Sequence, residues 1–270
     1  MLALAGCGGS ADPVHEVRSA ATTTLGLTGQ ATLALTGARL FGGTPGTIVG
    51  RAQYSFPKGL GYAALQVPAL GPRASGTAYL VFLPAELWSK PRVSTALPKG
   101  DLWVSVPFAN ARSAGSTTPS VAVTLESLNP ELLLQEIATG AVAARPSGHL
   151  VVNHVPFTRY IVTVDLERAL QATKSEALRA AMKQQLSALR SAGGESARPL
   201  VQVVAGVDGT GRLAQLQARV PGSKLGTVRI GLWTFGSRIP LSLPLRSETV
   251  DIASLRRSHA VTPASLFTGE

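Results

Sequence analysis

Hydrophobic residues recur with helical spacing near the N-terminus of the chain and with a period of two soon afterwards. The first pattern places apolar residues on one helical face at Val14, Val17, Ala21 and Leu25. Asp12-Pro13 stands before them, and a capping residue followed by proline is typical of a helix start. We therefore expect a helix from Pro13 to about Leu25, ended by Gly26.

From Gln30 onward, apolar and polar residues alternate, which is typical of strands buried on one face. Clusters rich in Gly and Pro separate the alternating segments, as in antiparallel sheets. The expected strands of this half are Gln30–Thr36, Thr47–Phe56, Gly61–Val67, Gly76–Leu83 and Leu102–Val106. A short helical turn is expected at Ala85–Ser89.

The second half of the chain mixes both patterns. Asn129-Pro130 repeats the capping signal and opens a helix that ends at Gly140. The longest expected helix runs from Leu166 to Ala192, and its apolar stripe includes Leu178, Met182 and Leu186. The strands expected here are His149–Val155, Arg159–Asp165, Pro199–Val207, Leu213–Val220 and Thr227–Phe235.

These elements predict an α+β fold with a single curved antiparallel sheet, a half-open β-barrel of about ten strands covered by about three helices. Locally paired strands with one polar face need a cover on the other face, and the amphipathic helices are available for it. We assign residues 13–257 to this domain and residues 258–270 to a flexible tail.

The chain has 270 residues, of which 45% are hydrophobic and 15% charged, so it can bury a large core and is not disordered overall. Its net charge of +10 favours anionic partners such as acidic lipid headgroups, wall polymer or nucleic acid. A basic but merely solvated surface is the alternative, because the basic residues are scattered. No motif supports nucleic-acid recognition, and no apolar run is long enough for a membrane-spanning helix.

Cys7 is the only cysteine, and Leu4-Ala5-Gly6-Cys7 is similar to the lipobox of bacterial lipoproteins. In this interpretation Cys7 carries acyl chains such as palmitate and anchors the domain at the outer face of the cell membrane. Residues 1–7 would be a truncated signal, since Met1 to Gly6 lack the basic and apolar regions of an export signal. Residues 8–12 would be a tether. The alternative is a chance thiol.

Signatures of catalysis are missing from the sequence. It contains no Gly-x-Ser-x-Gly elbow and no phosphate-binding Gly-x4-Gly-Lys loop. His149 and His154 are spaced poorly for a shared metal, and Asp208-Gly209-Thr210-Gly211 lacks the further carboxylates of a calcium loop. We expect this second motif to be a hairpin turn. The chain is therefore expected not to be an enzyme and to need no cofactor or metal.

A longer pattern supplies a family resemblance. Asn129-Pro130 opens a Leu-rich helix, a strand pair ends in Tyr160-Ile161-Val162-Thr163-Val164-Asp165-Leu166, and a hairpin carries Val207-Asp208-Gly209-Thr210-Gly211. This order resembles the LolA/LppX-like family of lipoprotein and lipid carriers of the bacterial envelope, over most of Gln30 to Leu255. The resemblance implies a half-open barrel with helices as a lid and a lipid-binding cavity between them.

Two functions are compatible with these features. In the first, an envelope lipoprotein binds or carries a lipid-like ligand between the sheet and the helices. The residues expected near such a ligand are Leu178, Met182, Leu186, Leu216 and Ile230. In the second, the domain is a non-enzymatic interaction or envelope-sensing module with a filled core. In either case we expect a monomer held at the membrane through its lipid anchor.

Overall fold

The computed structural model describes residues 12–38, 46–67, 76–84, 86–90, 103–107, 127–152, 155–193, 199–220, 226–251 and 254. Several features predicted from the sequence lie outside the described residues. They are the lipobox with Cys7, most of the tether, His154 and the tail 258–270.

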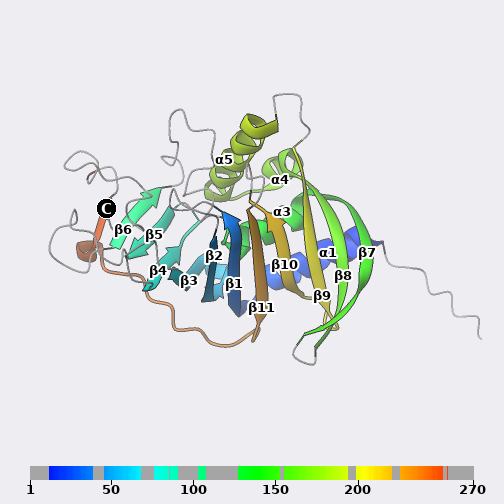
Figure 1. Cartoon of the computed structure of the whole chain (residues 1–270), viewed down its shortest axis with the longest axis horizontal. Helices are drawn as coiled ribbons and strands as arrows, with labels where there is room; N and C mark the ends of the chain where they lie inside the picture. Colours follow the sequence, from blue (N-terminus) through cyan, green and yellow to red (C-terminus); the bar gives the residue numbers. More distant parts are fainter. Residues whose placement is uncertain are drawn as a thin grey trace, which may run out of the picture.

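Helices and strands alternate along the chain much as the hydrophobic pattern predicts (Figure 1). The helices are α1 (Pro13–Leu25), α3 (Pro130–Gly140), α4 (Leu166–Ala172) and α5 (Glu176–Gly193), with short 3₁₀ turns η1 (Phe56–Lys58) and η3 (Arg246–Glu248). The first meander contains β1 (Thr28–Ala38), β2 (Gly46–Ser55), β3 (Leu60–Val67), β4 (Gly76–Phe82), β5 (Glu86–Lys90) and β6 (Trp103–Pro107). The second contains β7 (Ala141–Val152), β8 (Val155–Asp165), β9 (Leu200–Asp208), β10 (Leu213–Arg219) and β11 (Thr227–Trp233), and β12 (Thr249–Asp251) follows.

All the described strands belong to one open sheet of 12 strands, in the order β12-β6-β5-β4-β3-β2-β1-β11-β10-β9-β8-β7. The two meanders meet where β1 pairs with β11, with Leu33 opposite Ile230. This pairing joins segments about two hundred residues apart, so local sequence patterns could not predict it. The prediction of about ten strands was too low, and β12 runs parallel to β6 in an otherwise antiparallel sheet.

One face of the sheet is covered by helices (Figure 1). Helix α1 contacts β7 to β10, α3 packs on α1 and α4, and both α3 and α4 contact β8. Leu33 of β1, Val17 of α1 and Ile137 of α3 all belong to the main buried cluster. Burial of such apolar area is the dominant favourable term in folding. We call this covered side the inner face and the opposite side the outer face.

The helix expected from Leu166 to Ala192 is interrupted, which corrects that prediction. The hydroxyl of Thr173 donates to the carbonyl oxygen of Ala169 at 2.7 Å, at the end of α4. The hydroxyl oxygen of Ser175 accepts from the backbone N–H of Leu178 at 3.4 Å, at the start of α5. Thr and Ser compete with helical hydrogen bonds in this way and favour helix ends. The described chain therefore has four α-helices instead of about three.

The helical turn expected at Ala85–Ser89 was wrong, because Glu86–Lys90 form strand β5. Leu87 and Ser89 are buried while Glu86, Trp88 and Lys90 are partly exposed, so burial follows a period of two. β5 pairs with β4 on one side and β6 on the other. The predicted caps, by contrast, are confirmed: Asp12 and Asn129 accept hydrogen bonds from the backbone N–H groups of Val14 and Glu131.

Glu131, in the first turn of α3, makes the stability of the fold dependent on pH. Burial raises its pKa from 4.5 to about 7. Because the folded state holds this proton more tightly, its stabilising effect is complete below pH 4.5 and is lost as the pH rises through 7. We expect wild type to lose up to about 3 kcal/mol of unfolding free energy by pH 8.5 relative to Glu131→Gln.

Urea unfolding of both chains at pH 4.5 and pH 8.5 measures this difference. Gln has nearly the shape of the protonated carboxyl group, so the two chains should have similar stability at the lower pH. Equal losses of stability in both chains at the higher pH would show that Glu131 is not the group responsible.

Candidate functional site

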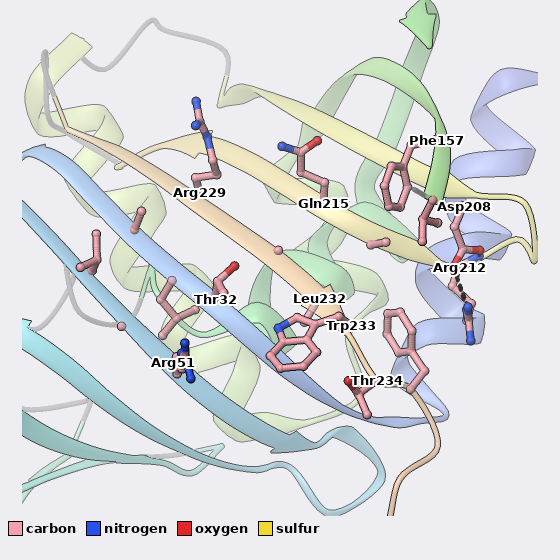
Figure 2. Close-up of a pocket in the computed structure, with 18 of the residues that line it drawn as sticks. Thr32, Arg51, Phe157, Asp208, Arg212, Gln215, Arg229, Leu232, Trp233 and Thr234 are labelled. Atoms are coloured by element: carbon pink, nitrogen blue, oxygen red, sulfur yellow. Dashed lines mark hydrogen bonds and ion pairs between the residues drawn. The ribbon is translucent and has the colours of Figure 1, made fainter. Parts of the chain in front are cut away.

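A groove of about 1070 Å³ crosses the outer face of the sheet, on the side away from α1 and α3 (Figure 2). Its volume lies at the upper end of the usual range for ligand pockets. We call it the outer groove. Its lining comes from β1, β2, β3, β8, the end of β9, the β9–β10 turn, β10, β11 and the segment after β11. The two halves of the chain therefore build the groove together.

Strand register places small side chains in the floor of the groove. Ala34 of β1 pairs with Val49 of β2 and with Arg229 of β11. Two residues before Ala34 on β1, Thr32 lies between Arg51 of β2 and Gly231 of β11. Because side chains of a strand alternate between its faces, these positions face outward while the residues between them are buried in the core.

Gly231 keeps the middle of the floor open. A Cβ at this position would lie 2.8 Å from the hydroxyl oxygen of Thr32, which is closer than real Cβ contacts. Both Gly231 and Thr32 line the groove. The glycine therefore lets two adjacent strands keep their spacing without a side chain rising between them.

Three arginines make the groove positively charged. Arg51 and Arg229 project from β2 and β11, and Arg212 lies in the β9–β10 turn. Arg229 donates to the side-chain oxygen of Gln217 at 3.4 Å. Within the part of the chain that the structure describes, neither Arg51 nor Arg229 has an ion-pair partner. These two guanidinium groups are therefore available to an anionic ligand.

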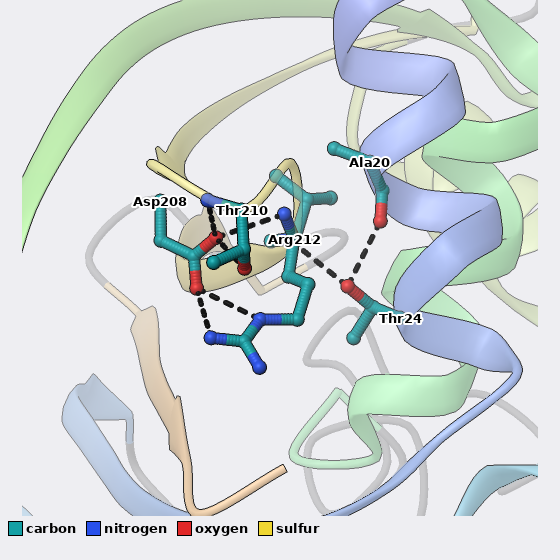
Figure 3. Close-up of polar contacts among 6 residues, drawn as sticks. Ala20, Thr24, Asp208, Thr210 and Arg212 are labelled. Carbon is teal, nitrogen blue, oxygen red and sulfur yellow. Dashed lines mark hydrogen bonds and ion pairs between the residues drawn. The ribbon is translucent and has the colours of Figure 1, made fainter. Parts of the chain in front are cut away.

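Asp208 is the acidic residue of the groove lining, and the β9–β10 turn satisfies its carboxylate (Figure 3). Its Oδ1 accepts from the backbone N–H of Thr210 at 2.9 Å, the hydroxyl of Thr210 at 2.7 Å and the backbone N–H of Arg212 at 3.1 Å. Its Oδ2 accepts from Nε of Arg212 at 2.9 Å and pairs with Nη2 at 2.8 Å. Burial opposes the charge, but these hydrogen bonds outweigh it and lower the pKa of Asp208. The predicted hairpin turn is confirmed.

The same turn is fastened to its surroundings on two sides. The guanidinium carbon of Arg212 lies 4.6 Å from the ring centroid of Phe235, a cation–π distance. On the inner side, the hydroxyl of Thr24 accepts from the backbone N–H of Leu213 at 2.9 Å and donates to the carbonyl oxygen of Ala20 at 2.8 Å (Figure 3). Helix α1 thus holds this end of the groove in place.

Aromatic side chains border the groove. Phe157 of β8 lies opposite Asp208, and Trp233 at the end of β11 is 44% exposed. Figure 2 shows both rings on the face of the sheet that carries Arg51. Thr234 follows with a φ of 52°, an uncommon conformation for a β-branched residue. This bend leads the chain to Phe235, which stacks on Arg212.

The structure places the predicted ligand-binding residues in the core and not in the outer groove. Leu178 and Met182 of α5 pack in a small cluster with residues of α3 and α4. Leu186, Leu216 and Ile230 belong to the main cluster beneath the helices. All five are at most 5% exposed. Leu186 also borders a shallower pocket of about 610 Å³ between α4 and α5, which is lined mostly by polar and charged residues.

Sequence reasoning missed the groove residues because they occupy the polar side of alternating strands. Arg51, Arg229 and Trp233 look like ordinary solvated positions when each strand is considered alone. A signal was present in the glycine and alanine at Gly231 and Ala34, since small outward residues in neighbouring strands leave a hollow. That signal becomes specific only when strand register is known.

Among the described residues, no cluster of three or more His, Cys, Asp or Glu side chains could hold a metal ion. His149 is exposed on β7. No helix in the described ranges combines the length and the apolar character needed to span a bilayer.

The fold and the groove together define a class of protein: an open α+β sheet with helices packed on one face and a basic, partly apolar groove on the other. No protein-family model matches the chain, and no curated protein matches it. Similarity is found among solved structures.

LprF from Mycobacterium bovis is 11% identical with a TM-score of 0.47, over 86% of this chain and 96% of that chain. The lipoprotein LppX from Mycobacterium tuberculosis is 10% identical with a TM-score of 0.47, over 85% and 97%. A LolA superfamily protein from Nitrosomonas europaea is 7% identical with a TM-score of 0.31, over 87% and 96%. LolA and LppX proteins are thus among the similar structures, as the sequence resemblance predicted. At these values the likeness describes the fold in outline.

Proposed function

We propose that this protein binds an amphipathic, lipid-like anion in the outer groove. The observation that carries the proposal is the combination of small residues in the floor, aromatic borders and the guanidinium groups of Arg51 and Arg229, which have no ion-pair partner among the described residues. An acyl chain would gain free energy from apolar contact with Trp233 and Phe157. A carboxylate or phosphate headgroup would be bound by the arginines, whose planar donors suit such groups.

This proposal moves the ligand from the inner face to the outer face of the sheet. The residues first expected to surround a ligand fill the core beneath the helices, where they are needed for packing. The outer groove offers volume and charge together. A bound lipid would therefore lie across the strands, with the helices behind the sheet acting as support.

A binding experiment tests the proposal. Native mass spectrometry and lipid extraction of the purified chain are expected to show a co-purified acidic lipid, and a fluorescent fatty acid should bind competitively with it. A fluorescent fatty alcohol of equal chain length is the matched neutral ligand and should bind at least about tenfold more weakly, the effect of losing one charge-assisted contact. The proposal would be contradicted if no lipid co-purified with the chain and no fatty acid bound to it.

A second candidate function follows from the packed core on the inner face. A filled core is what an interaction module at the envelope would have, and Leu216 and Ile230 are fully buried there. In that case the basic outer face would bind an anionic polymer without an acyl chain. Binding of such a polymer that the fatty acid cannot displace would favour this second function.

The proposal includes a location at the cell membrane, with the chain held by acylated Cys7. Its support is the lipobox-like Leu4-Ala5-Gly6-Cys7 and the net charge of +10, which would be attracted to anionic lipid near the membrane. At least two acyl chains are needed for stable anchoring. The mass of the N-terminal peptide from membrane-extracted protein shows whether Cys7 carries them.

A further inference from the structure

Exposed aliphatic side chains gather at the free end of the β7–β8 hairpin. Val151 is 70% exposed, Val155 is 44% exposed and Leu150 is 36% exposed. Val151 lies opposite Pro156 in the hairpin register, and Leu150 lies opposite Phe157. Because strand side chains alternate, these exposed residues lie on both faces of the hairpin near its end, which we call the hairpin end. It lies at the edge of the sheet (Figure 1).

The β7–β8 hairpin contains basic residues, and its first acidic residue along the chain is Asp165 at the end of β8. Residues 141–164 include Arg145, His149 and Arg159 and no Asp or Glu. Across the β8–β9 pairing, the neighbouring acid is Asp208, whose carboxylate is bound by Arg212. Aliphatic side chains with basic neighbours are the chemistry that binds anionic lipid surfaces.

The hairpin end is continuous with the outer groove. Val155 belongs to both, and Phe157, two residues further along the same face of β8, also lines the groove. A surface that contacted a bilayer at the hairpin end would therefore bring one end of the groove to the lipid headgroups.

Pairing of another protein strand with β7 is a poorer use of this edge. The register of β7 shifts between Ala141 and Ala143 and again between Pro146 and Gly148. Bulges, proline and basic side chains are the features by which edge strands avoid adding a further strand. The partner favoured by both shape and charge is thus a lipid surface.

We propose that the hairpin end of β7 and β8 is a contact surface for an anionic bilayer. Leu150, Val151 and Val155 enter the headgroup region, and Arg145 and Arg159 bind lipid phosphates beside them. This contact adjoins the ligand site of the proposed function, with which it shares Val155, and it is distinct from an anchor at Cys7. It orients the end of the outer groove that Val155 and Phe157 line toward the membrane.

Vesicle flotation tests the contact. The full chain carrying Cys7→Ser, so that no acyl anchor is present, is mixed with vesicles of phosphatidylglycerol and phosphatidylcholine or of phosphatidylcholine alone. The chain is expected to float with the anionic vesicles and to remain behind with the neutral ones. Adding Leu150→Asp and Val151→Asp is expected to reduce the bound fraction at least about tenfold, since both apolar contact and charge attraction are lost.

Matched controls make the result specific. Leu245→Asp changes a residue of similar exposure, 65%, far from the hairpin in sequence, and should not reduce flotation. Val151→Asp alone is a milder variant, and thermal unfolding verifies that each variant is folded. The groove variant Arg51→Glu with Arg229→Glu is expected to lose fatty-acid binding while the unchanged hairpin still binds vesicles, so the two proposals fail separately.

Three outcomes would overturn the inference. One is unchanged flotation of the folded Leu150→Asp, Val151→Asp chain. Another is an equal loss in Leu245→Asp, which would indicate a contact spread over the whole surface. The third is conversion of a dimer to a monomer by the hairpin changes in sedimentation, which would identify the hairpin end as an interface between two copies of the chain.

Discussion

Reversing the charge of Arg51 and Arg229 together, as Arg51→Glu with Arg229→Glu, is expected to weaken fatty-acid binding in the outer groove by about 100-fold or more. A hydrogen bond to a charged group contributes about 1.5–3 kcal/mol, and about 1.4 kcal/mol corresponds to tenfold in affinity. Both guanidinium groups lack ion-pair partners among the described residues. Fluorescence titration at constant ionic strength measures the loss.

A control with the same change in net charge separates local from general electrostatics. Arg219 and Arg238 are exposed and do not line the groove, so Arg219→Glu with Arg238→Glu should leave affinity within about threefold, as expected for screened surface charges. Binding of the neutral fatty alcohol should change little in either double variant. An equal loss in the control would show that the ligand responds to overall charge and that the groove is not its site.

Replacing Asp208 with Ala is expected to lower the free energy of unfolding by up to about 3 kcal/mol, because it removes the buried acceptor of a partly buried ion pair. The side chain of Asp208 is 4% exposed and accepts from two backbone N–H groups, the Thr210 hydroxyl and the Arg212 guanidinium. All of these donors would lose their acceptor. Urea unfolding at pH 7 measures the change.

Thr210→Val is the matched control, because it removes one hydroxyl donor and should cost only about 1 kcal/mol. The pH dependence identifies the charge. Since the folded state lowers the pKa of Asp208 below 3.8, its stabilising effect is present above pH 3.8 and is lost as the pH falls through the folded value. The difference between wild type and Asp208→Ala should therefore shrink in acid, and a difference that persists unchanged there would argue against the ion pair.

Local signals in the sequence predicted the helix starts and the hairpin turn well. Asp12 and Asn129 cap α1 and α3 as expected, because a cap depends on residues within one turn of the helix. The turn from Asp208 to Arg212 likewise depends on hydrogen bonds between residues close together in the sequence. The break between α4 and α5 was missed, although Thr173 and Ser175 are residues that favour helix ends.

The ligand-binding prediction rested on apolar side chains of the helices and strands, and it stays a prediction. Leu178, Met182 and Leu186 were chosen for their apolar stripe, and an apolar stripe is first of all what packs a helix into a core. The groove residues carry no such stripe. Arg51 and Arg229 become neighbours of one hollow only because β1 lies between β2 and β11.

By itself the sequence determined the type of each main element, the caps that begin the helices and the side chains of each strand that turn inward. These properties follow from contacts over a few residues and from the period of two in a strand. Only the tertiary structure decided the pairing of β1 with β11, and with it the outer groove and its arginines. The physical reason is that a cross-strand neighbour is set by register between distant segments, which no local pattern records.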